Sequence, residues 1–361
     1  MDRTATRISS EASPRPSSED DVFDTSYDVV VIGGGAAGLS GALALGRARR
    51  AVLVLDAGAP RNAPAGHVHN YLSSEGVAPS SLLATGRAEV AEYGVRVVQG
   101  TATAARRLEG GRAESSDASE GGRFRVELAG GRSVGARRLL VATGLVDELP
   151  AVPGVAERWG RDVLHCPYCH GWEVRDQAIG ILGTGPMAVH QAQLFRQWSA
   201  DVVLFLHEAP ALSEEQAEQL AARGVRVVEG QVAALEVEGD RLAGVRLRSG
   251  EVIPRQAVVV APRFVARPEV LGALGLETTE RELGGHLLAT FVPVDATGAT
   301  AMPGVWAAGN VADPFGQVIA AAADGLKAGA AINADLIAEE TDRAVAARRA
   351  RAAPAPEPVP A

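Results

Sequence analysis

The sequence contains very little of several residue types, and each shortage excludes a class of protein. Only two of the 361 residues are cysteines, so a framework of disulfides cannot hold this fold together. The basic residues are almost all arginine, and the single lysine, Lys327, indicates a compositional bias rather than a site. The net charge of −9 argues against a nucleic-acid partner, since such proteins usually present a basic face. No apolar run approaches the ~20 residues that span a bilayer, so we expect no membrane segment.

The two cysteines lie together in the run HCPYCH, residues 165–170. Two thiols at this spacing can close a small ring, which favours a reversible two-electron switch. The pattern also matches a c-type haem attachment site, but that chemistry normally needs export, and the N-terminus does not resemble a signal peptide. A zinc site would have to take His165, Cys166, Cys169 and His170 from six consecutive residues, with no second cysteine pair to complete it. We therefore predict a redox pair and no metal.

The composition bounds the fold and the compartment. The length allows about two domains. With 47% hydrophobic residues and 41 glycines, the chain is typical of an α/β protein with many tight turns. Without a targeting signal, the expected location is the cytoplasm, where a cysteine pair is more plausibly catalytic than structural.

The chain contains an internal repeat of one unit, a strand, a glycine turn, a helix and a second strand. The copies begin at Tyr27 and at Ala178, and each is expected to build a parallel sheet. The polar residues 1–24 predict a disordered leader, and the Ala- and Pro-rich residues 342–361 predict a disordered tail. The sequence thus predicts two Rossmann-like dinucleotide-binding domains.

The first glycine turn has the full context of a dinucleotide-binding motif. Gly33 permits the tight turn, Gly35 lets the backbone approach a pyrophosphate, and Gly38 allows the helix to pack closely on the strand. The phosphates would meet the N-terminus of the following helix, whose dipole favours anions. Asp56 ends the next strand and would accept hydrogen bonds from the adenosine ribose.

The order of motifs resembles the low-molecular-weight thioredoxin reductase family of flavoproteins, over about residues 26–340. The landmarks are the first glycine turn, Ala142-Thr143-Gly144, the cysteine pair before the second glycine turn, and the segment Gly304–Asn310. The resemblance implies an FAD-binding domain formed by residues 25–149 and 264–341, with a second nucleotide-binding-like domain, residues 150–263, inserted into it. It also implies further FAD contacts from Asn62, Thr143, Gly144, Gly309, Asn310, Gln317 and Val318.

Two positions depart from the family pattern. Asn310 stands where the family has Asp, although an amide can still hydrogen-bond the ribityl chain. At the second turn, thioredoxin reductases hold the 2′-phosphate of NADPH with a His-Arg-Arg run, whereas this chain has Leu206-His207-Glu208. Pro186 and Met187 add bulk to that turn. NADH in place of NADPH, weak binding, or no nicotinamide at all therefore remain open.

The run 166–173, CPYCHGWE, resembles one branch of the family, the dithiol oxidases of gliotoxin- and holomycin-type pathways. That resemblance implies that Cys169 lies against the flavin, that Cys166 exchanges with substrate, and that His170 serves as the base. Trp172 is expected to pack beside the flavin. The loop 60–69, with His67 and His69, is equally consistent with a solvated surface and with a functional role.

The favoured function is an oxidase that forms a disulfide in a small dithiol and passes electrons from the cysteine pair through FAD to O2. The alternative is an NAD(P)H-dependent disulfide reductase that acts on a small disulfide or on a thioredoxin-like protein. Relatives of this family are usually homodimers, so a homodimer is expected by resemblance.

Overall fold

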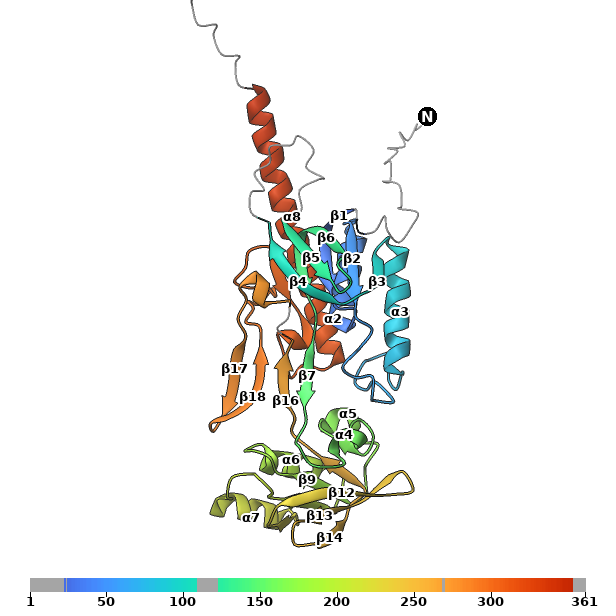
Figure 1. Cartoon of the computed structure of the whole chain (residues 1–361), viewed down its shortest axis with the longest axis vertical. Helices are drawn as coiled ribbons and strands as arrows, with labels where there is room; N and C mark the ends of the chain where they lie inside the picture. Colours follow the sequence, from blue (N-terminus) through green and yellow to red (C-terminus); the bar gives the residue numbers. More distant parts are fainter. Residues whose placement is uncertain (1–22, 24, 109–122, 268–269, 353–361) are drawn as a thin grey trace, which may run out of the picture.

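The computed structural model describes residue 23 and residues 25–108, 123–267 and 270–352 of the chain (Figure 1). Apart from residue 23, the predicted leader lies outside this part of the chain. The first sheet lies at one end of the molecule, and the segment between about residues 150 and 260 is gathered at the other.

The first sheet has seven strands in the order β3-β2-β1-β6-β5-β4, with β19 also paired to β6. The pairs among β1, β2, β3, β6 and β19 are parallel, while β5 pairs antiparallel with both β4 and β6. The strands are β1 (Ser26–Ile32), β2 (Val52–Asp56), β3 (Arg96–Gln99), β4 (Ala102–Arg107), β5 (Phe124–Leu128), β6 (Ser133–Val141) and β19 (Val305–Ala307).

Strand β1 shows why this sequence forms a central strand. Its run of β-branched residues is buried on both faces, as expected for a parallel sheet between two layers. Val29 and Val31 face one core cluster, which includes α2 (Ala36–Arg47) and α8 (Val318–Ala352), whereas Val30 and Ile32 face the other. The predicted elements of the first repeat are therefore present as a continuous strand–turn–helix–strand unit.

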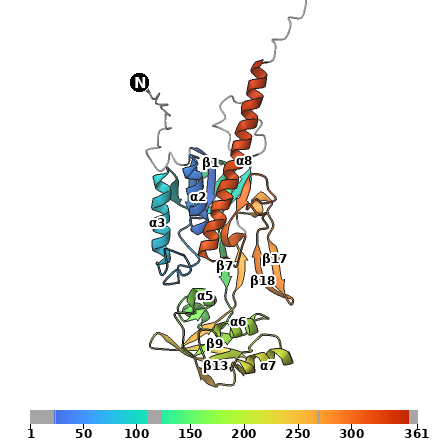
Figure 2. The ribbon, with the colours of Figure 1, turned by 180° about the vertical axis from the view of Figure 1, so that it is seen from behind.

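Helices α2 and α8 cross in close contact against the sheet (Figure 2). A β-carbon added to Gly325 of α8 would lie 1.9 Å from the backbone oxygen of Ala37, and one added to Gly329 would lie 2.7 Å from that of Gly41. Only glycine allows backbones to approach this closely. The contact fixes the position of the N-terminus of α8 relative to that of α2.

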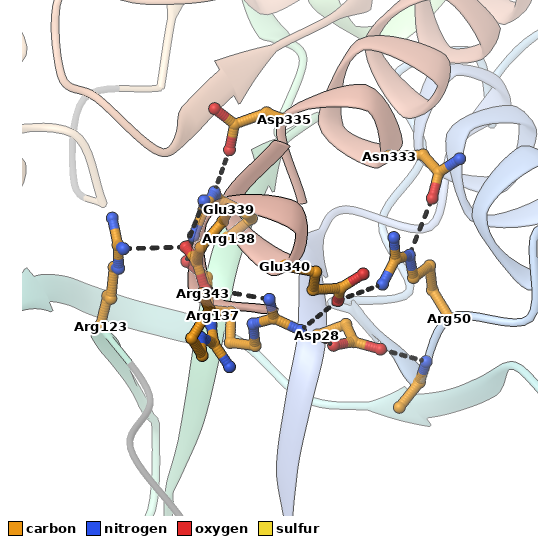
Figure 3. Close-up of polar contacts among 11 residues, drawn as sticks. Asp28, Arg50, Arg123, Arg137, Arg138, Asn333, Asp335, Glu339, Glu340 and Arg343 are labelled. Atoms are coloured by element: carbon orange, nitrogen blue, oxygen red, sulfur yellow. Dashed lines mark hydrogen bonds and ion pairs between the residues drawn. The ribbon is translucent and has the colours of Figure 1, made fainter. Parts of the chain in front are cut away.

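A cluster of ion pairs holds the C-terminal half of α8 to the sheet (Figure 3). Arg138 of β6 is almost fully buried and donates to Asp335 and Glu339 of α8. Arg137 joins Glu339 and Glu340 to Asp28 of β1. Asn333 and Glu340 accept hydrogen bonds from Arg50, and Arg123 and Arg343 also reach Glu339.

Burial opposes the charged form of Glu339, but the hydrogen bonds from Arg138 and Arg137 outweigh it. Together with the positive charges of Arg138 and Arg123, they lower the pKa of Glu339 to about 2. The carboxylate is therefore charged at neutral pH and holds the arginines of β6 against α8.

The second repeat builds a five-stranded sheet in the order β11-β10-β9-β15-β8, in which every pair is parallel. A small antiparallel sheet, β12-β13-β14, packs against it. These strands are β8 (Val163–Leu164), β9 (Ile179–Leu182), β10 (Val202–Phe205), β11 (Arg226–Val228), β12 (Val232–Glu238), β13 (Arg241–Leu247), β14 (Val252–Pro254) and β15 (Ala257–Val259).

A four-stranded sheet, β17-β18-β16-β7, joins the two ends of the molecule. Two of its strands, β7 (Leu145–Glu148) at one edge and β16 (Arg263–Ala266) beside it, pair antiparallel and carry the chain out of the first sheet and back. The others are β17 (Thr279–Leu283) and β18 (His286–Phe291). The remaining helices are α3 (Pro79–Glu92), α4 (Val155–Arg158), α5 (Pro167–His170), α6 (Ala188–Phe195), α7 (Glu214–Ala222), η1 (Gly272–Leu274) and η2 (Gly309–Val311).

One expectation about the C-terminus needs correction. Helix α8 continues to Ala352, so residues 342–352 are helical rather than part of a disordered tail, and residues 353–361 lie outside the described range. The residues from Glu339 to Ala352 are mostly alanine, arginine and glutamate, which are strong helix formers. Within the described residues, no helix has the length and apolar character that crossing a membrane requires.

Candidate functional site

A cavity of about 970 Å³ lies between the carboxyl edge of the first sheet and helix α5. All but one of the predicted site residues line it. They are Gly33, Gly35, Asp56, Asn62, Thr143, Gly144, Cys166, Cys169, His170, Gly309, Asn310, Gln317 and Val318. The exception is Gly38, which lies within α2 and does not line the cavity.

The first glycine turn forms one wall of the cavity. Gly33 has φ +118°, and a β-carbon there would lie 2.2 Å from the backbone oxygen of Ala142. At Gly35 an added β-carbon would have no neighbour within 4 Å, so this residue faces open space. At Gly38 it would lie 1.9 Å from the backbone oxygen of Gly33. The glycines thus keep the strand and helix tight and leave room in front of Gly35.

Several features of the cavity fit the flavin dinucleotide that the family resemblance implies. The N-termini of α2 and α8, at Ala36 and Val318, both reach the cavity, and helix N-termini favour the negative charge of phosphates. The Thr143 hydroxyl is buried without a hydrogen-bond partner among the described residues, as is Nε of Arg267. Buried polar groups are normally paired, so these two groups are available to a bound ligand.

Asp56 ends β2 at the rim of the cavity. One carboxylate oxygen accepts a hydrogen bond from the backbone N–H of Gly58 at 2.9 Å, and the other lies 3.5 Å from Nη1 of Arg87. The side chain is therefore held at the position where a ribose would meet the strand end.

Arg61 forms a cluster that the sequence did not indicate. Its guanidinium donates to both carboxylate oxygens of Asp147, at 2.6 and 2.8 Å, and lies over the ring of Phe264. It also donates to Oδ1 of Asn310 at 3.1 Å, while Nδ2 of Asn310 donates to the backbone oxygens of Asp313 and Gly316. An aspartate could not make the last two bonds, which explains why an amide suits this position.

Cys166 and Cys169 form a disulfide with their Cα atoms 5.2 Å apart. Pro167 starts the single turn of α5, and the backbone N–H groups of Cys169 and His170 both donate to the backbone oxygen of Cys166. Asn70, from the loop after β2, donates to the backbone oxygen of Tyr168 at 2.7 Å. The disulfide thus sits on a short turn that the first-sheet loop holds in place.

His170 lines the cavity, but its ring nitrogens are shielded from solvent. Both ring nitrogens are buried and have no hydrogen-bond partner among the described residues. Burial lowers the pKa of His170, while the charge of Glu173 acts to raise it and that of His69 to lower it. A neutral imidazole is the form that can accept a proton from a thiol.

His69 lies between two carboxylates. Its Nδ1 is 2.6 Å from Oε1 of Glu75, and its Nε2 is 3.3 Å from Oε1 of Glu173. The side chain is 18% exposed, so it is not the solvated histidine that one interpretation of the loop predicted. His67 lies 6.0 Å away, ring centroid to ring centroid, and lines the same cavity.

The expectation for Trp172 was wrong. Its side chain is 65% exposed, lies under the guanidinium of Arg175, and is not among the cavity-lining residues. The chain continues in turns after α5, and these carry position 172 outward while position 170 faces inward.

The second glycine turn is not part of this cavity. Neither Gly183 nor Gly185 lines it, and the position of an added β-carbon at Gly185 is 3.7 Å from Nδ1 of His286 in β18. The His207 side chain is only 6% exposed, and its Nδ1 accepts a hydrogen bond from the backbone N–H of Val232 at 3.1 Å. Burial lowers the pKa of His207, and the ring contacts the backbone of Val232 rather than solvent. Glu208 remains exposed beside it.

Sequence reasoning missed Arg61, Asp147, Asn70 and the carboxylates around His69. The position of Glu173, three residues after His170, was a visible signal because such spacing can bring side chains together on a helical turn. No comparable signal links residues that are far apart in the chain, such as Arg61 and Asn310. Among the described residues, no group of three or more His, Cys, Asp and Glu side chains could hold a metal ion.

Comparison with known proteins agrees with this geometry. Residues 27–325 match the model of the family described as pyridine nucleotide-disulphide oxidoreductase. Thioredoxin reductase sirT of Leptosphaeria maculans is 30% identical over 320 residues, covering 85% of this chain and 93% of that protein. Thioredoxin reductase tcpT of Claviceps purpurea is 31% identical over 69% of this chain and 78% of its own length.

Solved structures agree as well. The crystal structure of HlmI is 48% identical, with a TM-score of 0.80, and the match covers 90% of this chain and 97% of HlmI. An oxidoreductase from Agrobacterium tumefaciens is 35% identical, with a TM-score of 0.77, covering 86% of this chain and 99% of its own. The predicted fold class, two Rossmann-like units in an α/β protein, is confirmed. The chain belongs to the pyridine nucleotide-disulphide oxidoreductase family and, within it, is similar to thioredoxin reductases that use FAD.

Proposed function

We propose that the protein is an FAD-dependent dithiol oxidase that closes a disulfide in a small molecule and passes the electrons to O2. One observation carries the proposal: the disulfide Cys166–Cys169 and His170 line the same cavity as the glycine turn that would hold the dinucleotide. A thiol entering that cavity would meet an oxidised cysteine pair, a base and a cofactor site together.

The residues would act in a balanced exchange. His170 accepts the proton of the first substrate thiol, and the resulting thiolate attacks Cys166, so that the protein disulfide breaks and Cys169 leaves as a thiolate. The second substrate thiol then attacks the substrate sulfur bound to Cys166, releasing the product disulfide. Two electrons and two protons have left the substrate. The protons stay on Cys166 and His170, and Cys169 is a thiolate.

Bound FAD would supply the two-electron chemistry that links the reduced cysteine pair to O2, with hydrogen peroxide as the product. We infer that Gly33, Gly35, Gly38 and the α8 N-terminus hold its phosphates. The other contacts to FAD would come from residues that line the same cavity, namely Asp56, Asn62, Thr143, Gly144, Gly309, Asn310, Gln317 and Val318.

A reductase that carries electrons from NAD(P)H to a disulfide is the second candidate. It is supported by the thioredoxin reductase names of the relatives sirT and tcpT. The buried ring of His207 and the exposed carboxylate of Glu208 weigh against NADPH as the electron donor, because neither can pair with a 2′-phosphate. NADH lacks that phosphate, so this argument does not apply to it. A homodimer, a thioredoxin-like partner and a cytoplasmic location stay predictions from resemblance and composition.

The stoichiometry of turnover tests the proposal. In air, each molecule of dithiol consumed should yield one product disulfide and one hydrogen peroxide. The variants Cys166→Ser and Cys169→Ser should retain flavin but form no peroxide above the rate without enzyme. Peroxide formation that persists in Cys166→Ser would contradict the proposal, because the substrate would then reach the flavin directly.

A further inference from the structure

The proposed exchange leaves one proton transfer without a group to carry it. His170 takes the proton of the first substrate thiol. The second thiol must also lose its proton before its sulfur can attack the substrate sulfur bound to Cys166. At that stage His170 already carries a proton and cannot accept another. A second base is therefore needed, and it must be reachable from the cavity on the Cys166 side of the cysteine pair.

His165 is the other histidine beside the cysteine pair. It follows β8 and directly precedes Cys166, and both residues line the cavity. Its Nδ1 lies 3.0 Å from the backbone oxygen of Val260. A carbonyl oxygen can only accept a hydrogen bond, so Nδ1 carries the proton and Nε2 of the neutral ring has a free lone pair. This contact thus fixes the tautomer in which Nε2 can act as a base.

Nε2 of His165 is accessible, in contrast to the ring nitrogens of His170. It has no hydrogen-bond partner among the described residues, and it is not one of the buried unpaired atoms, which include both nitrogens of His170. The ring of Phe264 meets the His165 ring edge to face, with 5.2 Å between the centroids. Together with the bond to Val260, this contact holds the imidazole at the cavity wall with its basic nitrogen unblocked.

The surroundings of His165 keep the ring neutral. Burial lowers its pKa, and the hydrogen bond to Val260 acts to raise it. The charge of Arg61 also lowers the pKa, whereas that of Asp147 raises it, and these two side chains pair with each other. The net effect is a lowered pKa, so the unprotonated form prevails at neutral pH, as a proton acceptor requires.

We propose that His165 accepts the proton of the second substrate thiol and then returns it to Cys166. This inference rests on the proposed function and completes its proton balance. As the proton passes to Nε2 of His165, the substrate sulfur attacks the sulfur bound to Cys166, so the product disulfide forms and Cys166 leaves as a thiolate. The imidazolium of His165 then protonates that thiolate. The ring ends neutral, and the step needs no further oxidant or reductant.

The kinetic test compares His165→Asn with the unaltered protein, with dithiothreitol as the dithiol. The amide of asparagine can still donate to Val260 but cannot take up a proton. The cysteine pair can pass on two electrons only after substrate has left both sulfurs, so anaerobic flavin bleaching reports this step. At pH 7 the bleaching rate should fall about a hundredfold in His165→Asn. At pH 9.5 the two rates should become comparable, because thiols, with a pKa of about 8.5, then ionise without a base.

Acid quenching during the same reaction identifies the step that is blocked. At pH 7, His165→Asn should accumulate protein with one dithiothreitol in disulfide linkage to Cys166, which mass spectrometry detects, whereas the unaltered protein should show little of it. A slow reaction without this adduct would contradict the proposal. The control is His190→Asn, the same substitution at an exposed position of α6 outside the cavity, which should change neither the rate nor the adduct.

A labelling experiment tests the geometry without turnover. Diethylpyrocarbonate acylates accessible, unprotonated imidazole nitrogens, so it should label His165 and leave His170 unlabelled in the flavin-bound protein. Both histidines lie in the tryptic peptide of residues 162–175, and the fragment spectrum of that one peptide gives both results.

Three other outcomes would also overturn the inference. The first is bleaching at pH 7 that is as fast in His165→Asn as in the unaltered protein. The second is a defect that persists at pH 9.5, which would indicate a structural role. The third is labelling of His170 with none of His165. If no dithiol bleaches the unaltered protein, the proposed function fails, while the labelling still decides whether His165 presents its nitrogen to the cavity.

Discussion

The chain contains two strand–glycine turn–helix units that look alike in sequence and differ in what surrounds them. In the first unit, the space beside Gly35 is open and the strand ends in Asp56. The N-terminus of a second helix, α8, lines the same cavity. In the second, His286 of β18 lies near Gly185, and the strand is followed by a buried histidine, His207. The local pattern thus builds the same turn twice, but the elements packed around it decide whether it can bind a dinucleotide.

The largest expected effect comes from filling the two turns. Gly35→Val places a side chain in the open space that we assign to the pyrophosphate, so flavin affinity should fall about a hundredfold, which corresponds to roughly 2.7 kcal/mol. The matched variant Gly185→Val should keep the flavin content of the unaltered protein. Flavin absorbance after gel filtration measures both, and equal retention in the two variants would erase the difference that we infer between the turns.

The next effect concerns helix α8, whose N-terminus lines the same cavity as the first glycine turn. Glu339→Gln removes the carboxylate that joins Arg137 and Arg138 to α8, and should lower the free energy of unfolding by about 1–3 kcal/mol. Because the pKa of Glu339 is lowered to about 2, its contribution is present above its ordinary pKa of 4.5 and is lost as the pH falls toward 2. Urea unfolding at pH 7 and pH 3 should therefore show a larger difference between variant and parent at pH 7. A difference that grows in acid would contradict this account.

A smaller effect is expected at Asn310. Asn310→Asp keeps an acceptor for Arg61 but loses the two bonds that the amide donates to the backbone at Asp313 and Gly316. We expect stability to fall by roughly 1–2 kcal/mol. Thermal unfolding of the flavin-free and flavin-bound forms measures it. An equal or higher melting temperature would show that the amide does not hold this loop.

The smallest effect is expected from a positive charge added beside the second glycine turn. Glu208→Arg supplies one guanidinium to the strand end, but the position of His207 is still occupied by a buried ring. We expect NADPH to bleach the flavin no faster in this variant than in the parent. Stopped-flow absorbance measures the rate of bleaching. Rapid bleaching would mean that the charge of Glu208 alone prevents NADPH from binding in the parent protein.

Local patterns predicted much of the fold. Both repeats follow the sequence within a few residues, because buried β-branched strands and glycine turns are specified locally. The helical end of α8 was not predicted. The prolines lie only after residue 352, but the predicted disordered tail also included the preceding Ala- and Arg-rich residues, which have high helix propensity.

The polar contacts of the site were less predictable. The glycine turn and the CxxCH run mark their own positions in the sequence, but Arg61 meets Asp147 and Asn310 only after three separate segments have packed together. The same is true of His69 and Glu173, which are about a hundred residues apart. Such pairs depend on tertiary structure and leave no periodic signal in the chain.

Anaerobic stopped-flow of the flavin-bound protein against dithiothreitol, NADPH and NADH distinguishes a dithiol oxidase from a reductase. For an oxidase, dithiol alone should bleach the flavin, and admission of air should restore the colour with one hydrogen peroxide per flavin. Fast bleaching by NADPH or NADH, with none by dithiol, would contradict the proposed oxidase and would make the protein a reductase whose second glycine turn binds nicotinamide in spite of its surroundings.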